Sequence, residues 1–168
     1  MKKKIIIAAI LMIVMVFVFG GCAGTGGCGG AAVIARPAPQ EGAEVHYVTG
    51  SCTATLSGNE ITVSGTSDIM DGTNGTISIL GLNGKVLEEE KITKEGDNLT
   101  YTFTVDPSWP DIVYGFITFG PKVGDSQSRD INDVYGRNFQ NVDGDEGTIV
   151  WDKQNLSVVF KSEAVELG

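Results

Sequence analysis

The sequence predicts an all-β domain, an antiparallel β-sandwich of about seven or eight strands, with a small β-barrel as the competing fold. From residue 45 onward, short apolar runs are separated by turn residues at the spacing of antiparallel β proteins. Residues 99–105 alternate between apolar or aromatic and threonine side chains, which is the period of a half-buried strand. No helical pattern longer than about two turns is visible after the first 21 residues.

The N-terminus has the pattern of a signal peptide. Three lysines at positions 2–4 precede an uncharged apolar run from Ile5 to Phe19, which is 15 residues long. A helix of that length rises about 22 Å, which is short for a bilayer core of about 30 Å. The run is therefore expected to be the hydrophobic part of a cleaved leader, residues 1–21, and not a permanent span.

The residues that end this run carry the most specific motif of the chain. Phe19-Gly20-Gly21-Cys22 resembles the lipobox of bacterial lipoproteins, although that family usually has an aliphatic residue where Phe19 stands. The resemblance implies a diacylglyceryl group on the Cys22 sulfur and cleavage between Gly21 and Cys22, which would anchor the chain to the outside of the cell membrane. The alternatives are an uncleaved N-terminal anchor and lipidation of Cys28.

Residues 22–44 are rich in Gly, Ala and Pro and show no periodicity, so they are expected to form a flexible tether between the lipid and the domain, residues 45–168. Two further cysteines remain, Cys28 in the tether and Cys52 in the first strands. An oxidising compartment permits a disulfide between them, and two separate thiols are the alternative.

The turn signals and apolar runs place the strands. Asn83-Gly84 predicts a hairpin with a type I′ turn, and the almost wholly apolar run Ile112–Phe119 predicts a central strand buried on both faces. The polar stretch that follows contains one candidate helix, Asp130–Tyr135. The other candidate strands are residues 45–48, 51–56, 60–64, 76–80, 85–93, 99–105, 148–151 and 156–161, the last two forming a hairpin across Asp152–Asn155.

This strand pattern, over about residues 48–165, resembles the immunoglobulin-like and fibronectin-like domains of bacterial surface proteins. The likeness is general, because the Cys…Trp…Cys signature of antibody domains is missing.

The net charge of the chain limits the classes of partner that the protein can bind. The formal net charge is −9, and loss of the leader with its three lysines would leave 9 basic against 21 acidic residues. Such a surface is repelled by phosphate backbones, which argues against nucleic acid as a partner. Cationic ligands, divalent metals, envelope proteins and glycans remain.

Two candidate ligand sites stand out. Asn141, Asp143, Asp145 and Asp152 place oxygen atoms at spacings close to those of a calcium loop, but Glu146 stands where such a loop needs glycine. The competing interpretation is a polar turn. Trp109, between Ser108 and Pro110 in a loop, is a candidate for stacking on a sugar, or else it caps the end of the sandwich. Trp151 is expected in the core. No cofactor other than calcium is predicted.

No catalytic constellation is visible. His46 is the single histidine, and the sequence has no GxSxG, HExxH or phosphate-binding glycine loop. The sequence therefore favours a non-catalytic binding or interaction module anchored to the membrane by the lipid on Cys22. The alternatives are a carboxylate-based or calcium-assisted protein acting on glycans, and a structural envelope protein.

Overall fold

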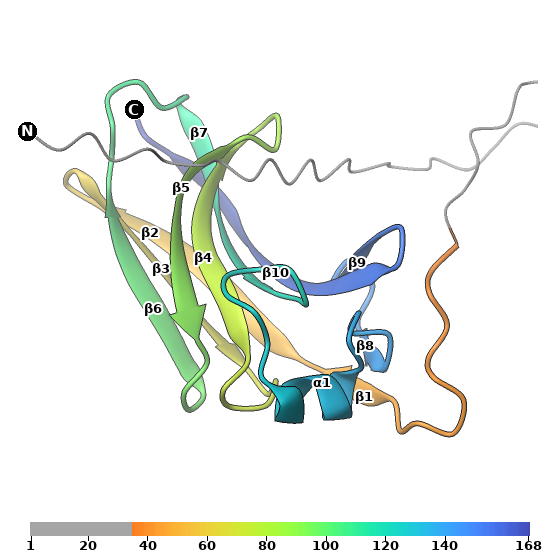
Figure 1. Ribbon diagram of the computed structural model, residues 1–168. Coiled ribbons are helices and arrows are strands. Elements are labelled where there is room, and N and C mark those ends of the chain that lie inside the picture. Colours follow the sequence, from red (N-terminus) through yellow and green to blue (C-terminus); the bar gives the residue numbers. More distant parts are fainter. Residues whose placement is uncertain (1–34) are drawn as a thin grey trace, which may run out of the picture.

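The structure is a computed structural model that describes residues 35–168 (Figure 1). The predicted leader, Cys22 and Cys28 lie outside the described residues. Within the described part, the chain contains no helix with the length and apolar character needed to span a membrane.

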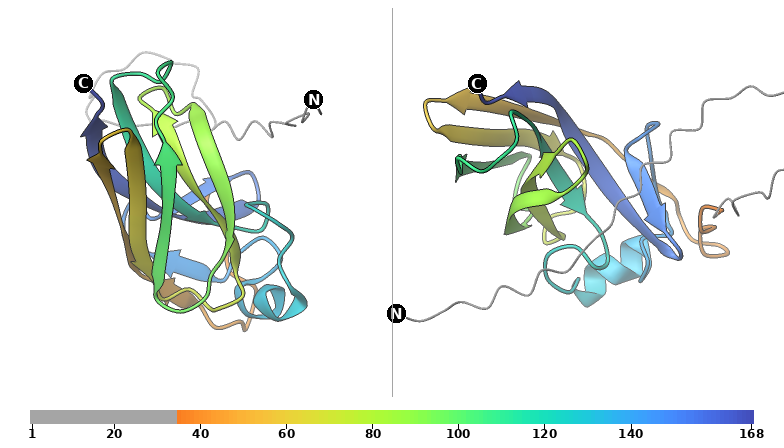
Figure 2. Two further views of the ribbon diagram at one scale, coloured as in Figure 1. Left: turned by 90° about the vertical axis from the view of Figure 1, so that its left-hand side faces the viewer. Right: turned by 90° about the horizontal axis from the view of Figure 1, so that it is seen from above.

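Two antiparallel sheets pack together, which confirms the predicted all-β sandwich. No ladder joins the two sheets into the barrel that was the competing fold. Figure 2 shows the same layers from two further sides. The strands of the first sheet are, in spatial order, β2 (Gly50–Ser57), β3 (Glu60–Ser67) and β6 (Asn98–Thr104). Those of the second sheet are, in spatial order, β5 (Val86–Thr93), β4 (Asn74–Gly81), β7 (Ile112–Phe119), β10 (Asn155–Glu166) and β9 (Ile149–Asp152).

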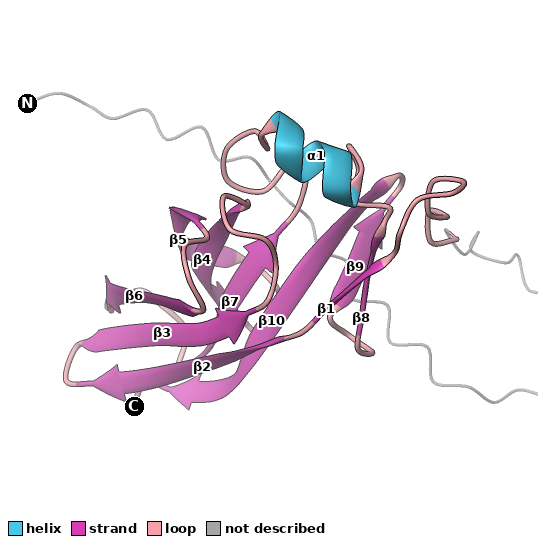
Figure 3. Ribbon diagram, turned by 90° about the horizontal axis from the view of Figure 1, so that it is seen from below, coloured by secondary structure: helices cyan, strands magenta, loops and turns pink. Residues whose placement is uncertain are grey.

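Ten strands are present in the described part, more than the seven or eight predicted. β1 (His46–Val48), which was predicted at residues 45–48, runs parallel to β8 (Val142–Gly144), which was not predicted. Together with the helix α1 (Arg129–Tyr135), they lie at one end of the sandwich (Figure 3). The predicted helix at Asp130–Tyr135 is confirmed to within one residue.

The chain passes between the sheets in a Greek-key order. It forms β2 and β3 in one sheet, β4 and β5 in the other, returns for β6, and crosses again to β7. The last strand, β10, pairs with β7 on one side and lies close to β2. This arrangement agrees with the immunoglobulin-like expectation.

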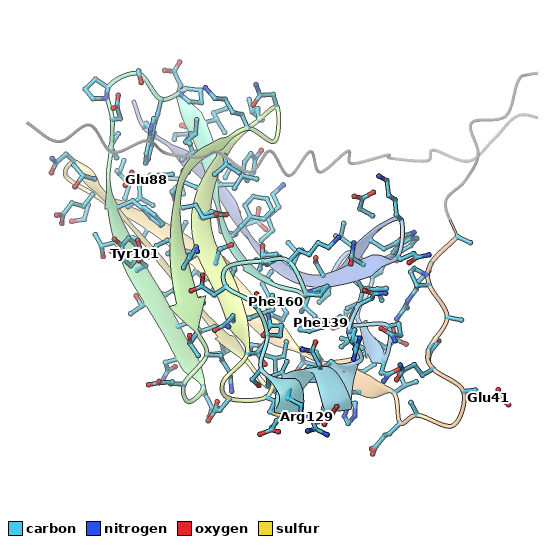
Figure 4. All side chains as sticks on the ribbon, in the orientation of Figure 1. Glu41, Glu88, Tyr101, Arg129, Phe139 and Phe160 are labelled. Carbon is cyan, nitrogen blue, oxygen red and sulfur yellow. The ribbon has the colours of Figure 1, made fainter. Side chains whose placement is uncertain are left out.

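Alternating side chains from both sheets form one core. Ile61, Val63 and Phe103 enter it from the three-stranded sheet, and Ile77 and Phe119 enter it from the five-stranded sheet. Strand β7 is central in its sheet and almost wholly buried, as its apolar sequence predicts. Phe139 and Phe160 extend the core toward α1 (Figure 4).

The hairpin predicted at Asn83-Gly84 joins β4 to β5, but the turn type is not the predicted one. Only Gly84 has a positive φ, of 73°. Its amide donates to the Gly81 carbonyl oxygen at 2.9 Å, and the pairing register shifts beside the turn. The loop is therefore a type I turn completed by a glycine bulge, the usual three-residue alternative to type I′.

Strand β5 is an open edge of the five-stranded sheet. Glu88 (Figure 4), Glu89 and Glu90 stand in its middle and are exposed. Lys91 follows them and pairs with Asp125 at 2.6 Å.

Candidate functional site

The predicted calcium loop is occupied by the chain's own N-terminal segment. The Asn141 side chain is buried, and its Oδ1 accepts a hydrogen bond from the Gln40 amide at 3.0 Å. Its Nδ2 donates to the Gln40 Oε1 at 3.3 Å and to the Val134 carbonyl oxygen at 3.4 Å. This carboxamide is thus fully used in holding protein groups.

The neighbouring carboxylates are engaged in the same way. Arg36 donates to the Asp143 Oδ1 at 2.8 Å and to the Val142 carbonyl oxygen at 2.6 Å. The Arg36 hydrogen bond, followed by one from the Gly144 amide, lowers the pKa of Asp143. The Tyr47 hydroxyl donates to Asp145, and this bond is the main cause that raises the pKa of Tyr47.

Asp152, the fourth predicted ligand, is exposed at the end of β9. Among residues 35–168, no group of three or more His, Cys, Asp or Glu side chains is placed to hold a metal ion. The structure therefore does not bring the four predicted calcium ligands together.

These contacts define an N-terminal strap, residues 36–47. The Arg36 side chain reaches β8, the chain turns where the Ala43 amide donates to the Gln40 carbonyl oxygen, and it then enters β1, which pairs with β8 (Figure 1). Most of it lies in the stretch predicted as flexible tether. No local sequence pattern predicts this docking, because the partners of Arg36 and Gln40 lie more than 100 residues away.

The structure places Trp109 in the second of its two predicted roles and places Trp151 against expectation. Trp109 is half-buried and packs against the core at the end of the sandwich, which leaves only part of its ring for a ligand. Trp151 was expected in the core, and this expectation was wrong: its exposed fraction is 38%. It lies on β9, an edge strand, where the facing sheet does not cover it.

His46 and Cys52 do not form a catalytic pair. The His46 ring contacts the Tyr135 ring edge-on, with centroids 5.5 Å apart. The Cys52 thiol lies between the sheets and donates to the Gly115 carbonyl oxygen at 3.5 Å. Burial raises the pKa of Cys52 to about 12, so this thiol is a poor nucleophile.

A bulge in β10 lies beside Cys52. The register between β10 and β7 shifts between Lys161 and Ala164, and Gly115 lies opposite the shift. The buried Gly115 amide donates to the Ser162 Oγ at 2.9 Å, which replaces the lost ladder bond.

A polar pocket of about 630 Å³ lies beside α1, and sequence reasoning did not find it. Arg129 (Figure 4), Asp133 and Arg137 contribute to its wall. Arg129 pairs with Asp133 at 3.5 Å, and both side chains are highly exposed. The lining residues are Pro121, Ser126, Gln127, Arg129, Asn132, Asp133 and Arg137.

The outer surface of the three-stranded sheet is the most regular polar surface of the domain, and we name it the hydroxyl face. Most inward positions on these strands contact the core, although Tyr101 on the edge strand β6 is 37% exposed, and every outward position is polar. Two of its cross-strand rows are Thr53–Ser64–Thr100 and Thr55–Thr62–Thr102. Its residues are Ser51, Thr53, Thr55, Ser57, Glu60, Thr62, Ser64, Thr66, Asn98, Thr100, Thr102 and Thr104.

Hydrogen bonds connect these side chains across the strands. Oxygen–oxygen distances are 2.9 Å for Ser51–Thr66, 2.9 Å for Thr62–Thr102 and 3.0 Å for Ser64–Thr100. Cross-strand pairs of this kind stabilise a sheet and fix the rotamers of its side chains. The sequence showed the alternation in residues 99–105, but only the strand register reveals that three such strands form one surface.

Comparison with protein-family models, with curated proteins and with solved structures gives no match.

Proposed function

We propose that the chain is a membrane-anchored extracytoplasmic lipoprotein that displays a non-catalytic β-sandwich binding module. One observation carries the proposal: Cys22 directly follows two small residues at the end of a 15-residue apolar run that begins after three lysines. This order of charge, apolar run and cysteine is what a lipoprotein leader requires.

The described part of the chain is compatible with display of a folded domain. The strap brings the chain into the sandwich at the end formed by β1, β8 and α1, while the C-terminal residue lies at the opposite end (Figure 1). Between Cys22 and Arg36 there are 13 residues, and a chain of that length with the Gly- and Ala-rich composition of a flexible linker is expected to span about 20 Å. The domain would thus stay close to the membrane.

The non-catalytic part of the proposal is supported by the chemistry of the candidate groups. The single histidine packs on Tyr135, and the Cys52 thiol is buried with a raised pKa. The carboxylates at the predicted calcium loop hold the strap.

Metabolic labelling with radioactive palmitate in a bacterial host tests the anchor. We expect label on the wild-type protein and on Cys28→Ala, and no label on Cys22→Ala. The wild type should stay in the membrane fraction after a salt wash, and its mass should match cleavage before Cys22. Label that persists on Cys22→Ala, or a mass that includes residues 1–21, contradicts the proposal.

A further inference from the structure

The hydroxyl face is almost free of charge in a strongly acidic chain. The full sequence carries 21 acidic residues, yet the face includes one carboxylate, Glu60, at its end beside Ser57 and Thr104. Its other positions are ten Ser or Thr residues and Asn98. A partner of this face is therefore selected by hydrogen bonding, since an ionic partner would find no complementary charge.

The face is also held in one arrangement. Thr62 lies in the middle strand, bonded to Thr102 on β6, and Ser64 is bonded in the same way to Thr100. Each hydroxyl that is fixed by a neighbour still has a lone pair or a proton to offer. Because their rotamers are already set, these groups lose little conformational entropy when a ligand binds.

The size and composition of the face argue against a protein partner. Three strands about 4.8 Å apart and about eight residues long give a surface of roughly 14 by 26 Å. This is about half of what one partner contributes to a standard protein–protein interface. The face has no outward aromatic, methionine or arginine side chain, the types that usually anchor such interfaces.

A long, narrow and uncharged surface with repeating hydroxyls fits a ligand with the same properties. We propose that the hydroxyl face binds a neutral polysaccharide chain, whose own hydroxyl groups alternate as donors and acceptors along its length. This inference deepens the proposed function by naming the ligand class of the module. It depends on that proposal only for the module's position outside the cell.

Co-sedimentation of the full-length protein in mild detergent with insoluble cellulose, β-1,3-glucan and chitin tests the inference. The wild type should sediment with at least one of them in a saturable manner. The double variant Thr62→Val/Thr102→Val removes two central hydroxyls but keeps shape and β-propensity, and its affinity should fall about tenfold. The matched control is Thr93→Val, an exposed threonine on β5 of the other sheet. Circular dichroism and thermal melting check that each variant is folded.

Three results would overturn the inference: no sedimentation of the wild type with any of the three polysaccharides, equal affinity of the double variant and the wild type, or equal weakening by Thr93→Val. Dimerisation of the wild type that the double variant abolishes would instead make the face a contact between two copies. Palmitate labelling tests the lipid anchor independently of polysaccharide binding. A labelled protein that binds no polysaccharide contradicts only this inference. An unlabelled protein that binds a polysaccharide contradicts only the proposed lipid anchor.

Discussion

Arg36 and Asp143 are 107 positions apart in the sequence, yet their side chains meet at 2.8 Å and fasten the start of the domain to β8. Both side chains are partly exposed, at 32% and 41%. An ion pair at this exposure contributes little to global stability. Its effect is local: it holds the first residues of the strap on the domain, beside the bonds between Gln40 and Asn141.

Replacing Arg36 by alanine should loosen the start of the strap while the sandwich remains folded. The two hydrogen bonds to Asp143 and Val142 are lost, so Glu41 and Glu44 become more accessible. Cleavage by a glutamate-specific protease at these sites should accelerate about three- to tenfold. Arg129→Ala is the control, because it removes an exposed ion pair elsewhere. If both variants are cut at the wild-type rate, Arg36 does not hold the strap.

Lys94 and Asp71 form an asymmetric ion pair in which the lysine side chain is 5% exposed and the aspartate 63%. Asp71→Ala would leave a buried ammonium group without this partner and should lower the melting temperature by about 4 °C or more. Lys94→Met retains the packed stem and leaves Asp71 in water, so its effect should be smaller. Thermal melts of both variants at pH 7 test this order, and a larger loss for Lys94→Met would contradict it.

The same pair predicts how stability changes with pH. The Lys94 hydrogen bond lowers the pKa of Asp71 below its ordinary value of 3.8. The contribution of Asp71 is therefore complete above the ordinary pKa and is lost as the pH falls through the lowered pKa of the folded state. Between pH 5 and pH 2, the difference in melting temperature between wild type and Asp71→Ala should shrink. A constant difference would show that the carboxylate charge has no role.

Ser162→Ala should destabilise the domain by about 1–3 kcal/mol, because the buried Gly115 amide would lose its acceptor at the bulge. Urea denaturation measures the change. Ser57→Ala, an exposed serine at the end of β2, is the control and should stay within about 0.5 kcal/mol of the wild type. A similar small effect for Ser162→Ala would mean that another group accepts from this amide.

Cys52 should be almost inert to alkylation in the folded protein. A pKa of about 12, against an ordinary 9.0, leaves roughly 1,000-fold less thiolate at pH 8. In reduced Cys28→Ser protein, mass spectrometry should show iodoacetamide labelling of Cys52 only after urea is added. Equal labelling rates with and without urea would contradict the burial of the Cys52 thiol.

Non-reducing peptide mapping of the wild type separately distinguishes a Cys28–Cys52 disulfide from two thiols.

The sequence predicted those features of the fold that depend on local pattern. The apolar run of β7, the hairpin at Gly84 and the helix near Asp130 are all present. Strand β8 was missed because Val142–Gly144 has only one apolar residue and pairs with the equally short β1. Short strands of this kind owe their existence to tertiary contacts and have no periodicity of their own.

The candidate sites were harder to predict for the same reason. Asn141 and Asp143 have the spacing of metal ligands, but Gln40 and Arg36 reach them from the other end of the chain. The spacing indicates which ion a loop could bind. It does not reveal that a distant segment of the same chain already occupies the loop. Trp151 was misplaced because apolar neighbours suggest burial, whereas its edge position in the sheet leaves it uncovered.

The three adjacent glutamates of β5 have a consequence for solubility. An open strand edge offers unpaired amide and carbonyl groups, and such an edge can recruit the same edge of another copy and start aggregation. Glu88, Glu89 and Glu90 would bring like charges together if two copies aligned β5 against β5. The repulsion is strongest in low salt, because ions screen it over about 10 Å at 0.1 M. These three charges therefore oppose extension of the five-stranded sheet from β5 of one molecule into β5 of the next.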